Sequence, residues 1–163
     1  MINQAGLDLL KSREGCRLDA YQDGAGVWTI GWGHTGRDVT EGLQWTQDQA
    51  DAALIADVGQ VSAQVGLMVP RTLGRNQFAA LVVFAYNVGA AAFGGSSVCQ
   101  AANNTGSHTQ ADVPARLLLW DKVRDPHTRE LVPCAGLLAR RMAEGSLWRQ
   151  PDVTGISTAE GGE

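Results

Sequence analysis

The sequence predicts an α+β fold with a small N-terminal lobe of one helix and short β-hairpins, a long connecting helix and a larger, all-helical C-terminal lobe. Strand-forming residues interrupted by glycines occupy 17–39, which favours short hairpins. Apolar residues then recur at helical spacing over 46–65. Beyond Pro70 almost every segment has helical periodicity. Together these three patterns indicate an α+β chain.

The length of the chain favours one folding unit. A chain of 163 residues can form one compact domain with two lobes and is too short for two independent domains. We expect a single domain over 1–150, in which a helix at 46–65 joins a mixed lobe at 12–45 to a helical lobe at 66–150. Residues 151–163 are rich in Gly, Ser, Thr and Glu and are predicted to form a flexible tail.

The first helix is predicted to begin near Gln4 and to end at a carboxylate. Leu7 and Leu10 share one helical face, and Glu14 follows seven residues after Leu7 on the same side. Gly15 comes next and suits a helix C-terminus. We therefore expect the Glu14 side chain to lie at the edge of a core.

The glycine-rich segment that follows contains a polar turn and a polar strand residue. Asp23-Gly24 is a turn signature, and a turn aspartate accepts hydrogen bonds from nearby backbone N–H groups. Taken alone, Asp23 therefore has a complete structural explanation. Thr29 taken alone is an ordinary strand threonine.

The remaining segments are predicted to be mainly helical. Thr46 begins a capping box with Gln49, which indicates the start of a helix of about five turns. Further helices are expected at Asn76–Val88, after Ser97, near Pro114–Trp120 and at Gly136–Trp148, with a loop at Gly106–Thr109 and a turn at Asp125-Pro126.

Charge and cysteine content exclude several classes of protein. The formal net charge of −4 argues against nucleic-acid binding, which requires a basic face. The chain has neither a basic start before an apolar run nor about 18 consecutive apolar residues, so we expect no signal peptide and no membrane anchor.

Cys16, Cys99 and Cys134 lack CxxC spacing, which indicates neither a disulfide framework nor a zinc site. They are interpreted as reduced, buried thiols, with a Cys99–Cys134 bridge left open.

Two carboxylates near the N-terminus suit the hydrolysis of a glycosidic bond. That reaction needs an acid that stays protonated near neutral pH and a second carboxylate that remains ionised. Glu14 beside the apolar face of its helix loses hydration, which favours its protonated form, whereas Asp23 in a glycine turn stays solvated. The alternative for Glu14 is a structural ion pair with Arg140 or Arg141.

Three blocks of the sequence carry a family resemblance. The first, "EGCRLDAYQDGAGVWTIGWGHT" at Glu14–Thr35, has Glu, eight residues, Asp, five residues, Thr and then Ile-Gly-x-Gly-His. The second is "NQFAALVVFAYNVGAAAFGGSS" at Asn76–Ser97, and the third is "GLLARRMAEGSLW" at Gly136–Trp148. In this order and spacing they resemble the phage-type lysozymes, the endolysins of glycoside hydrolase family 24. The resemblance implies a lysozyme-like fold.

The resemblance implies a role for three residues of the first block. Glu14 would be the general acid, Asp23 the second carboxylate, and Thr29 the residue that holds the attacking water. The family is generally regarded as inverting, which would make Asp23 a base acting on that water, with the two carboxyls about 6.5 to 9.5 Å apart. A gap of about 5 Å would instead indicate a covalent intermediate.

Alignment with the family's substrate contacts implies four further residues. Thr35, Tyr86, Asn87 and Ser96 are expected to touch the sugar chain. Tyr86 also fits a core aromatic residue and Ser96 a helix N-cap, so both alternatives stay open.

Three basic residues are expected to support the site. His34 follows a glycine hairpin and is interpreted as a structural residue with satisfied hydrogen bonds rather than as a catalytic base. Either Arg140 or Arg141 is expected to reach Glu14. The resemblance implies no metal and no cofactor.

The resemblance also implies an activity and a setting. The protein would be a muramidase that cleaves the β-1,4 bond between N-acetylmuramic acid and N-acetylglucosamine in peptidoglycan during phage-driven lysis. It would accumulate as a monomer in the host cytoplasm and reach the wall in the periplasm through a holin-like membrane lesion. Its acidic charge departs from a family that is often basic and does not favour tight electrostatic binding to the wall.

Other functions stay open from the sequence. A lysozyme-like toxin domain or a prophage remnant would keep the same chemistry. A catalytically dead wall-binding module is disfavoured because Glu14, Asp23 and Thr29 are all intact. A lytic transglycosylase would need only the acid and would leave Asp23 unexplained. The segments 103–112 and 123–132 have no assigned contacts.

Overall fold

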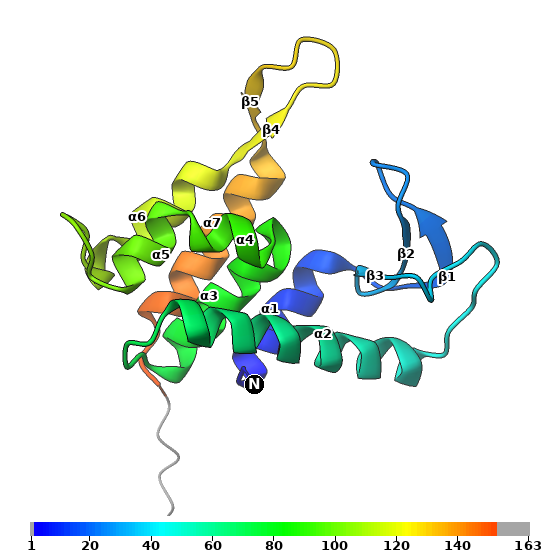
Figure 1. The fold of residues 1–163 in the computed structure, drawn as a ribbon, viewed down its shortest axis with the longest axis horizontal. Coiled ribbons are helices and arrows are strands. Elements are labelled where there is room, and N and C mark those ends of the chain that lie inside the picture. Colours follow the sequence, from blue (N-terminus) through cyan, green and yellow to red (C-terminus); the bar gives the residue numbers. More distant parts are fainter. Residues whose placement is uncertain (1, 153–163) are drawn as a thin grey trace, which may run out of the picture.

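A computed structural model describes residues 2–152, and a small antiparallel sheet and a group of helices lie at the two ends of the long helix α2 (Figure 1). This arrangement confirms the predicted α+β fold. The helices are α1 (Gln4–Glu14), α2 (Gln47–Met68), α3 (Arg75–Val88), α4 (Ala90–Gly94), α5 (Ser97–Ala102), α6 (Val113–Leu117) and α7 (Ala135–Arg149), with short 3₁₀ helices at Gln110–Asp112 and Leu118–Trp120. The strands are β1 (Arg17–Gln22), β2 (Trp28–Gly31), β3 (His34–Thr35), β4 (Lys122–Arg124) and β5 (Leu131–Pro133).

The sheet near the N-terminus has the order β1-β2-β3, with both pairs antiparallel. Strand β2 packs on α2, and its Ile30 is fully buried. Gly31 follows with a φ of +63°, and a Cβ there would lie 3.2 Å from the Trp45 ring and 3.3 Å from the Ala50 Cβ. Only glycine lets the strand pass this close to the start of α2.

Helix α2 begins at the predicted capping box. The Thr46 hydroxyl accepts a hydrogen bond from the Gln49 N–H, and the Gln49 side chain accepts one from the Thr46 N–H. The helix ends at Met68 rather than at the expected residue 65. Its buried face consists of Ala50, Leu54, Val58, Ser62 and Val65.

The core of the helical lobe is built on α3, in which all residues from 79 to 85 are buried. Helix α7 packs along α3, and α1 packs on both (Figure 1). Leu10 of α1 and the preceding Ile2 join the same core. The first helix therefore belongs to the helical lobe and not, as its neighbouring sequence suggested, to the lobe with the hairpins.

A β-hairpin interrupts the C-terminal lobe, which was predicted to be all-helical, and Figure 1 shows it projecting from that lobe. Strands β4 and β5 are antiparallel, with Val123 opposite Val132. The predicted turn at Asp125 is present, because its Oδ1 accepts two backbone N–H groups at 2.8 Å each. The C-terminal lobe is thus not all-helical. Strands of three mostly exposed residues are too short for an alternating pattern to indicate them.

All three cysteines are free thiols. Cys99 is buried, as interpreted, whereas Cys16 and Cys134 are half-buried. Burial raises the pKa of Cys99, and the hydrogen bond from Asn103 only partly opposes this. The Cys99 thiol therefore stays protonated at neutral pH.

The described chain ends at Asp152, which caps helix α3. Its carboxylate accepts hydrogen bonds from the Arg75 N–H at 2.7 Å and the Asn76 N–H at 2.8 Å. The N-cap residue of α3 is Gly74, which has no side chain to do this. Asp152, the second residue of the predicted tail at 151–163, is therefore bound to α3, and positions 153–163 lie outside the described residues.

We expect Asp152→Ala to lower the melting temperature at pH 7, because the first N–H groups of α3 lose their acceptor. The hydrogen bonds from Asn76 and Arg75 hold the pKa of Asp152 below its ordinary value of 3.8. Its stabilising effect is thus present above that value and is lost as pH falls through the lower pKa of the folded state. Thermal unfolding followed by circular dichroism at neutral pH and near pH 2 tests both points. If Asp152→Ala lowers the melting temperature as much near pH 2 as at neutral pH, the expected loss of the Asp152 contribution in acid is contradicted.

Candidate active site

Glu14 is the last residue of α1, and its carboxylate forms an ion pair with α7. The helix ends because Gly15 adopts a φ of +67°. Glu14 Oε1 accepts a hydrogen bond from Arg140 Nη1 at 2.8 Å, and Arg140 Nη2 donates to the Arg13 carbonyl at 2.9 Å. The sequence left open whether Arg140 or Arg141 reaches Glu14. In the structure Arg140 binds it.

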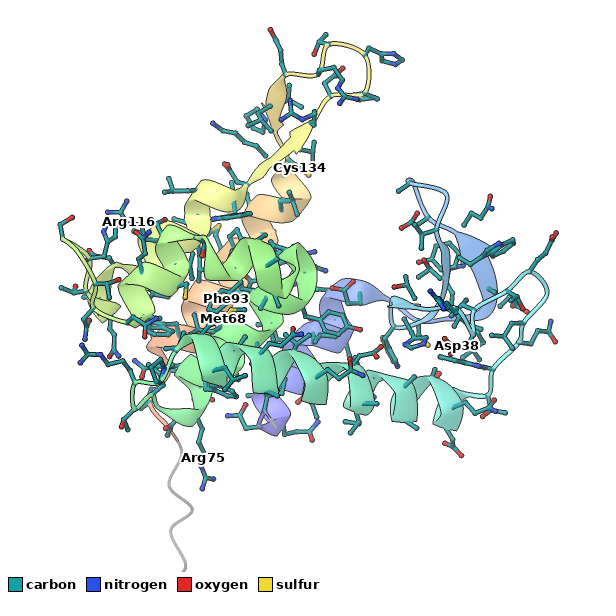
Figure 2. All side chains as sticks on the ribbon, in the orientation of Figure 1. Asp38, Met68, Arg75, Phe93, Arg116 and Cys134 are labelled. Carbon is teal, nitrogen blue, oxygen red and sulfur yellow. The ribbon has the colours of Figure 1, made fainter. Side chains whose placement is uncertain are left out.

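A depression of about 490 Å³ opens beside Glu14. It lies where the end of α1, the end of α3, strand β4 and the start of α7 meet; Figure 2 labels Cys134, which lies at the base of the hairpin. Its lining residues are Ser12, Arg13, Glu14, Asn87, Val123, Cys134, Gly136, Leu137 and Arg140. A ligand in this space would contact the Glu14 carboxylate directly.

The surroundings of Glu14 differ from the apolar environment that its helix face indicated. Leu10 faces the core, but Glu14 lies one turn later, where the helix ends and its side chain reaches α7. The Glu14 and Arg140 side chains are 21% and 10% exposed. A partly shielded contact with Arg140 therefore replaces the predicted contact with leucines.

Asp23 lies in the exposed turn between β1 and β2, in the hydrogen-bonded setting that the Asp-Gly signature predicted. Its Oδ1 accepts hydrogen bonds from the Ala25 N–H at 2.8 Å and the Val27 N–H at 2.9 Å. Asp23 is not among the residues that line the depression beside Glu14. The two candidate carboxylates therefore come from different lobes, one from the sheet and one from α1.

Thr29 is buried in the centre of β2, with 4% exposure. It pairs with Tyr21 of β1 and Thr35 of β3. Its hydroxyl donates to the Val27 carbonyl at 3.0 Å, so the hydroxyl oxygen keeps its lone pairs for another donor.

A second depression, of about 240 Å³, lies between the sheet, α2 and α3. Thr35 and Tyr86 both line it, together with Asp57. The Tyr86 hydroxyl donates to the Trp32 carbonyl at 3.2 Å, and burial, with smaller contributions from the charges of Asp57 and Glu14, raises the Tyr86 pKa.

Gly33 brings the two depressions next to each other. It lines the second one, and Glu14 Oε2 lies within 3.8 Å of the point where a Gly33 Cβ would be. Thr35, Tyr86 and Asn87 therefore line two adjoining surfaces.

Ser96 is buried and serves as the N-cap of α5. Its hydroxyl donates to the Phe93 carbonyl at 2.6 Å and accepts from the Cys99 N–H at 3.1 Å. It lines neither of these depressions. The structure thus assigns Ser96 to the capping role that the sequence had left as its alternative.

His34 forms an acid–imidazole cluster with two aspartates. Its Nδ1 lies 2.7 Å from Asp57 Oδ2, and its Nε2 lies 3.3 Å from Asp38 Oδ2. Partial burial lowers the pKa of His34, but the hydrogen bonds and charges of Asp57 and Asp38 outweigh it, so the pKa lies above its ordinary value of 6.5. His34 therefore joins β3 to α2, as its structural interpretation predicted. Asp57, an acid within the apolar repeat of its helix, was not recognised as its partner.

We expect the stabilising effect of this cluster to decrease with rising pH. Because the His34 pKa is raised on folding, the contribution of the charged imidazole is fully present below pH 6.5 and is lost as pH rises through the folded-state pKa. Asp57→Asn should thus lower the melting temperature more near pH 5.5 than near pH 9. Thermal unfolding across this range checks it, with the exposed Glu41→Gln as a control for charge removal. If Asp57→Asn lowers the melting temperature equally near pH 5.5 and near pH 9, the charge of His34 does not contribute to stability through Asp57.

Helix α7 contains a buried ion pair that the sequence analysis missed. The Arg141 and Glu144 side chains are both 0% exposed, and Arg141 Nη2 lies 3.3 Å from Glu144 Oε1. Arg141 Nη2 also donates to Asn87 Oδ1. Burial raises the pKa of Glu144 to about 7, with Arg141 and Arg140 opposing the shift. The spacing of Arg141 and Glu144 was a visible signal, but spacing alone does not tell which face of a helix is buried.

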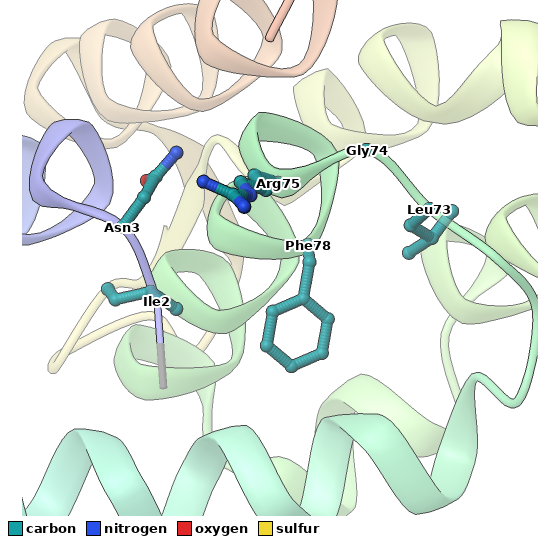
Figure 3. Close-up of a pocket in the computed structure, with 6 residues that line it drawn as sticks. All are labelled: Ile2, Asn3, Leu73, Gly74, Arg75 and Phe78. Carbon is teal, nitrogen blue, oxygen red and sulfur yellow. The ribbon is translucent and has the colours of Figure 1, made fainter. Parts of the chain in front are cut away.

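A separate pocket of about 400 Å³ lies at the opposite end of α3 (Figure 3). Its lining residues are Ile2, Asn3, Leu73, Gly74, Arg75 and Phe78, and no carboxylate is among them. Within residues 2–152, no three His, Cys, Asp or Glu side chains are grouped so that they could hold a metal ion. Over the same range, no helix combines the length and the apolar character that crossing a membrane requires.

Comparison with known proteins gives matches over most of the chain. The sequence model of the family described as "Phage lysozyme" matches residues 11–144. The endolysin of Acyrthosiphon pisum secondary endosymbiont phage 1 is 37% identical over 147 residues, covering 90% of this chain and 97% of that protein. The endolysin of Salmonella phage P22 is 35% identical over 152 residues, with the same coverage. The solved muramidase domain of SpmX from Asticaccaulis excentricus matches with a TM-score of 0.84 at 35% identity, covering 93% of this chain and 99% of that domain.

Proposed function

Because the chain belongs to the phage lysozyme family, we propose that it is an endolysin that hydrolyses the β-1,4 bond between N-acetylmuramic acid and N-acetylglucosamine in bacterial peptidoglycan. It is a glycoside hydrolase of the lysozyme type, and wall degradation serves host cell lysis. The observation in the structure that carries the proposal is Glu14 on the wall of an open depression, with Arg140 on one carboxylate oxygen.

Glu14 is the general acid in this proposal. Arg140 occupies Oε1, so Oε2 is the oxygen left to carry the proton, and it faces the Gly33 backbone where the two depressions adjoin. Transfer of this proton to the glycosidic oxygen lets the leaving sugar depart as an alcohol. The guanidinium of Arg140 then stabilises the carboxylate that remains.

Asp23 and Thr29 act on the attacking water. Asp23 Oδ1 is held by two backbone N–H groups, which leaves Oδ2 to take the proton from the water. The Thr29 hydroxyl donates to Val27, so its oxygen can accept a hydrogen bond from the same water. Attack at the anomeric carbon opposite the leaving group inverts its configuration and produces a free reducing end.

The glycan strand binds along the two adjoining depressions. Thr35 and Tyr86 would contact it on the sheet side, and Asn87 would contact it beside Glu14. Ser96 is left out of this surface because it is buried and its hydroxyl caps α5. His34 supports the surface by holding β3 on α2.

The setting is also part of the proposal. The protein acts on the cell wall, as endolysins do. We place it in the host cytoplasm as a monomer until a holin-like lesion releases it to the periplasm. Its partners are peptidoglycan glycan strands.

An end-group assay on purified peptidoglycan tests the reaction. Hydrolysis produces new reducing ends, a lytic transglycosylase produces anhydro ends, and a wall-binding module without turnover produces neither. We expect reducing ends from the wild-type protein. Anhydro ends, or binding to the wall with no new ends, would overturn the proposal. Loss of turbidity in outer-membrane-permeabilised Gram-negative cells is the matching cellular measurement.

A further inference from the structure

We propose that Glu144 is a positioning residue that acts through Arg141 to hold Asn87 with its amide NH₂ group towards the glycan. Asn87 is then a hydrogen-bond donor, and its partner is an acceptor oxygen of the glycan, such as an acetamido carbonyl or a hydroxyl. This inference rests on the proposed function, because it takes the depression beside Glu14 as the glycan-binding surface.

The contact between Arg141 and Asn87 determines which end of the amide faces the substrate. A guanidinium group only donates hydrogen bonds, so the atom that meets Arg141 Nη2 is the acceptor Oδ1 of Asn87. The Nδ2 group is therefore the one left for a ligand. Asn87 is exposed at the end of α3 and lines the depression together with Glu14 and Arg140. An asparagine without such a partner could rotate and present either end.

Besides Asn87, two residues contact the Arg141 side chain. Glu144 Oε1 lies 3.3 Å from Nη2, and the Arg141 Cζ lies 4.8 Å from the centre of the Phe84 ring. Arg141 and Glu144 are both fully buried. Arg141 Nε and Nη1 and both Glu144 oxygens lack hydrogen bonds within the described residues. A buried ion pair with so few hydrogen bonds is a poor source of stability, which points to a role at the site.

Glu144 also gives Arg141 an acidic partner different from that of Arg140. Arg140 is paired with Glu14, and Arg141 lies close enough to feel the charges of both. With a carboxylate of its own, Arg141 is kept on Asn87 and does not compete for Glu14. Each arginine thus has one anion: Arg140 has the proposed acid, and Arg141 has Glu144.

Steady-state kinetics on purified, solubilised peptidoglycan test the inference. Asn87→Asp keeps an acceptor for Arg141 but loses the NH₂ donor, and Asn87→Ala loses both. We expect each to raise KM by about three- to tenfold, the size of one lost hydrogen bond, with little change in kcat. Glu144→Gln should raise KM to a similar degree. The double variant Glu144→Gln with Asn87→Ala should be no worse than Asn87→Ala, since both changes remove the same contact.

Two further variants separate positioning from general structure. Arg141→Met combined with Glu144→Leu removes the pair without leaving a buried lone charge, and should keep the fold while raising KM like Asn87→Ala. Glu41→Gln removes one exposed carboxylate elsewhere and should leave KM unchanged. Melting temperatures of all variants accompany the kinetics.

The outcomes distinguish this inference from the proposed function. If the wild-type protein releases no reducing ends, the proposed function fails and the inference fails with it. If the wild-type protein is active but the Asn87 variants keep its KM, the donor role alone is overturned. If the rise in KM of the double variant equals the product of the rises in its two single variants, Glu144 does not act through Asn87. The same conclusion follows if Arg141→Met combined with Glu144→Leu keeps the wild-type KM.

Discussion

Replacing Glu14 with glutamine is expected to lower the release of reducing ends by about 10²- to 10⁴-fold, which is the usual contribution of a positioned general acid. Glutamine has no acidic proton to give to the glycosidic oxygen. Its Oε1 can still accept the hydrogen bond from Arg140 Nη1, so the end of α1 should remain on α7. The variant therefore separates the chemistry of the carboxyl group from its structural contact.

The stability of Glu14→Gln decides whether the activity loss is chemical. The apolar setting inferred from the sequence favoured an unchanged or higher melting temperature. The ion pair with Arg140 removes the reason for an increase. We therefore expect a lower melting temperature, with the loss limited by the hydrogen bond that the glutamine Oε1 still accepts from Arg140. Thermal unfolding and the end-group assay on one preparation measure both quantities, with Glu41→Gln as the charge-matched control. An active Glu14→Gln, or one that loses activity by unfolding, would count against the assignment.

Asp23→Asn is expected to cause a loss of similar size, about 10²- to 10⁴-fold. The Asn Oδ1 can still accept the N–H groups of Ala25 and Val27, so the β1–β2 turn is kept. The atom that changes is Oδ2, where an NH₂ group cannot take a proton from water. Activity should fall while the melting temperature stays close to that of the wild type.

Two other substitutions sharpen the test at Asp23. Asp23→Ala removes the turn acceptor as well as the base, so it should lower both activity and melting temperature. Asp23→Cys should keep some turnover where a thiolate can replace the base. Full activity in Asp23→Ala would remove this residue from the mechanism, whereas an inactive but stable Asp23→Asn supports it.

Local features of the site could be predicted from the sequence because they depend on a few neighbouring residues. The end of α1 at Glu14 follows from Gly15, the start of α2 follows from Thr46 and Gln49, and the hydrogen bonds of Asp23 follow from the turn it occupies. Each involves groups within four positions along the chain. Propensity and capping rules operate over that range.

Contacts between distant segments could not be predicted in this way. The partner of Glu14 lies 126 positions away, and only the packing of α7 on α1 and α3 decides that it is Arg140. The same packing buries Arg141 and Glu144. The site-forming surface beside Glu14 also includes Val123 of the hairpin, whose short strands carried no periodic signal.

The position of α1 has a consequence for how the two proposed catalytic carboxyls meet. Glu14 belongs to the helical lobe, whereas Asp23 belongs to the sheet. The chain connects the two lobes at Gly15 and through α2. Side-chain contacts add to these links: the Tyr86 hydroxyl donates to the Trp32 carbonyl, and the Lys11 ammonium lies 5.0 Å from the centre of the Trp32 ring. The separation of the two carboxyls therefore depends on how the sheet packs on α2 and, through Trp32, on the helical core. The arrangement that the proposed reaction requires is thus set where the sheet meets the helices, rather than within either lobe.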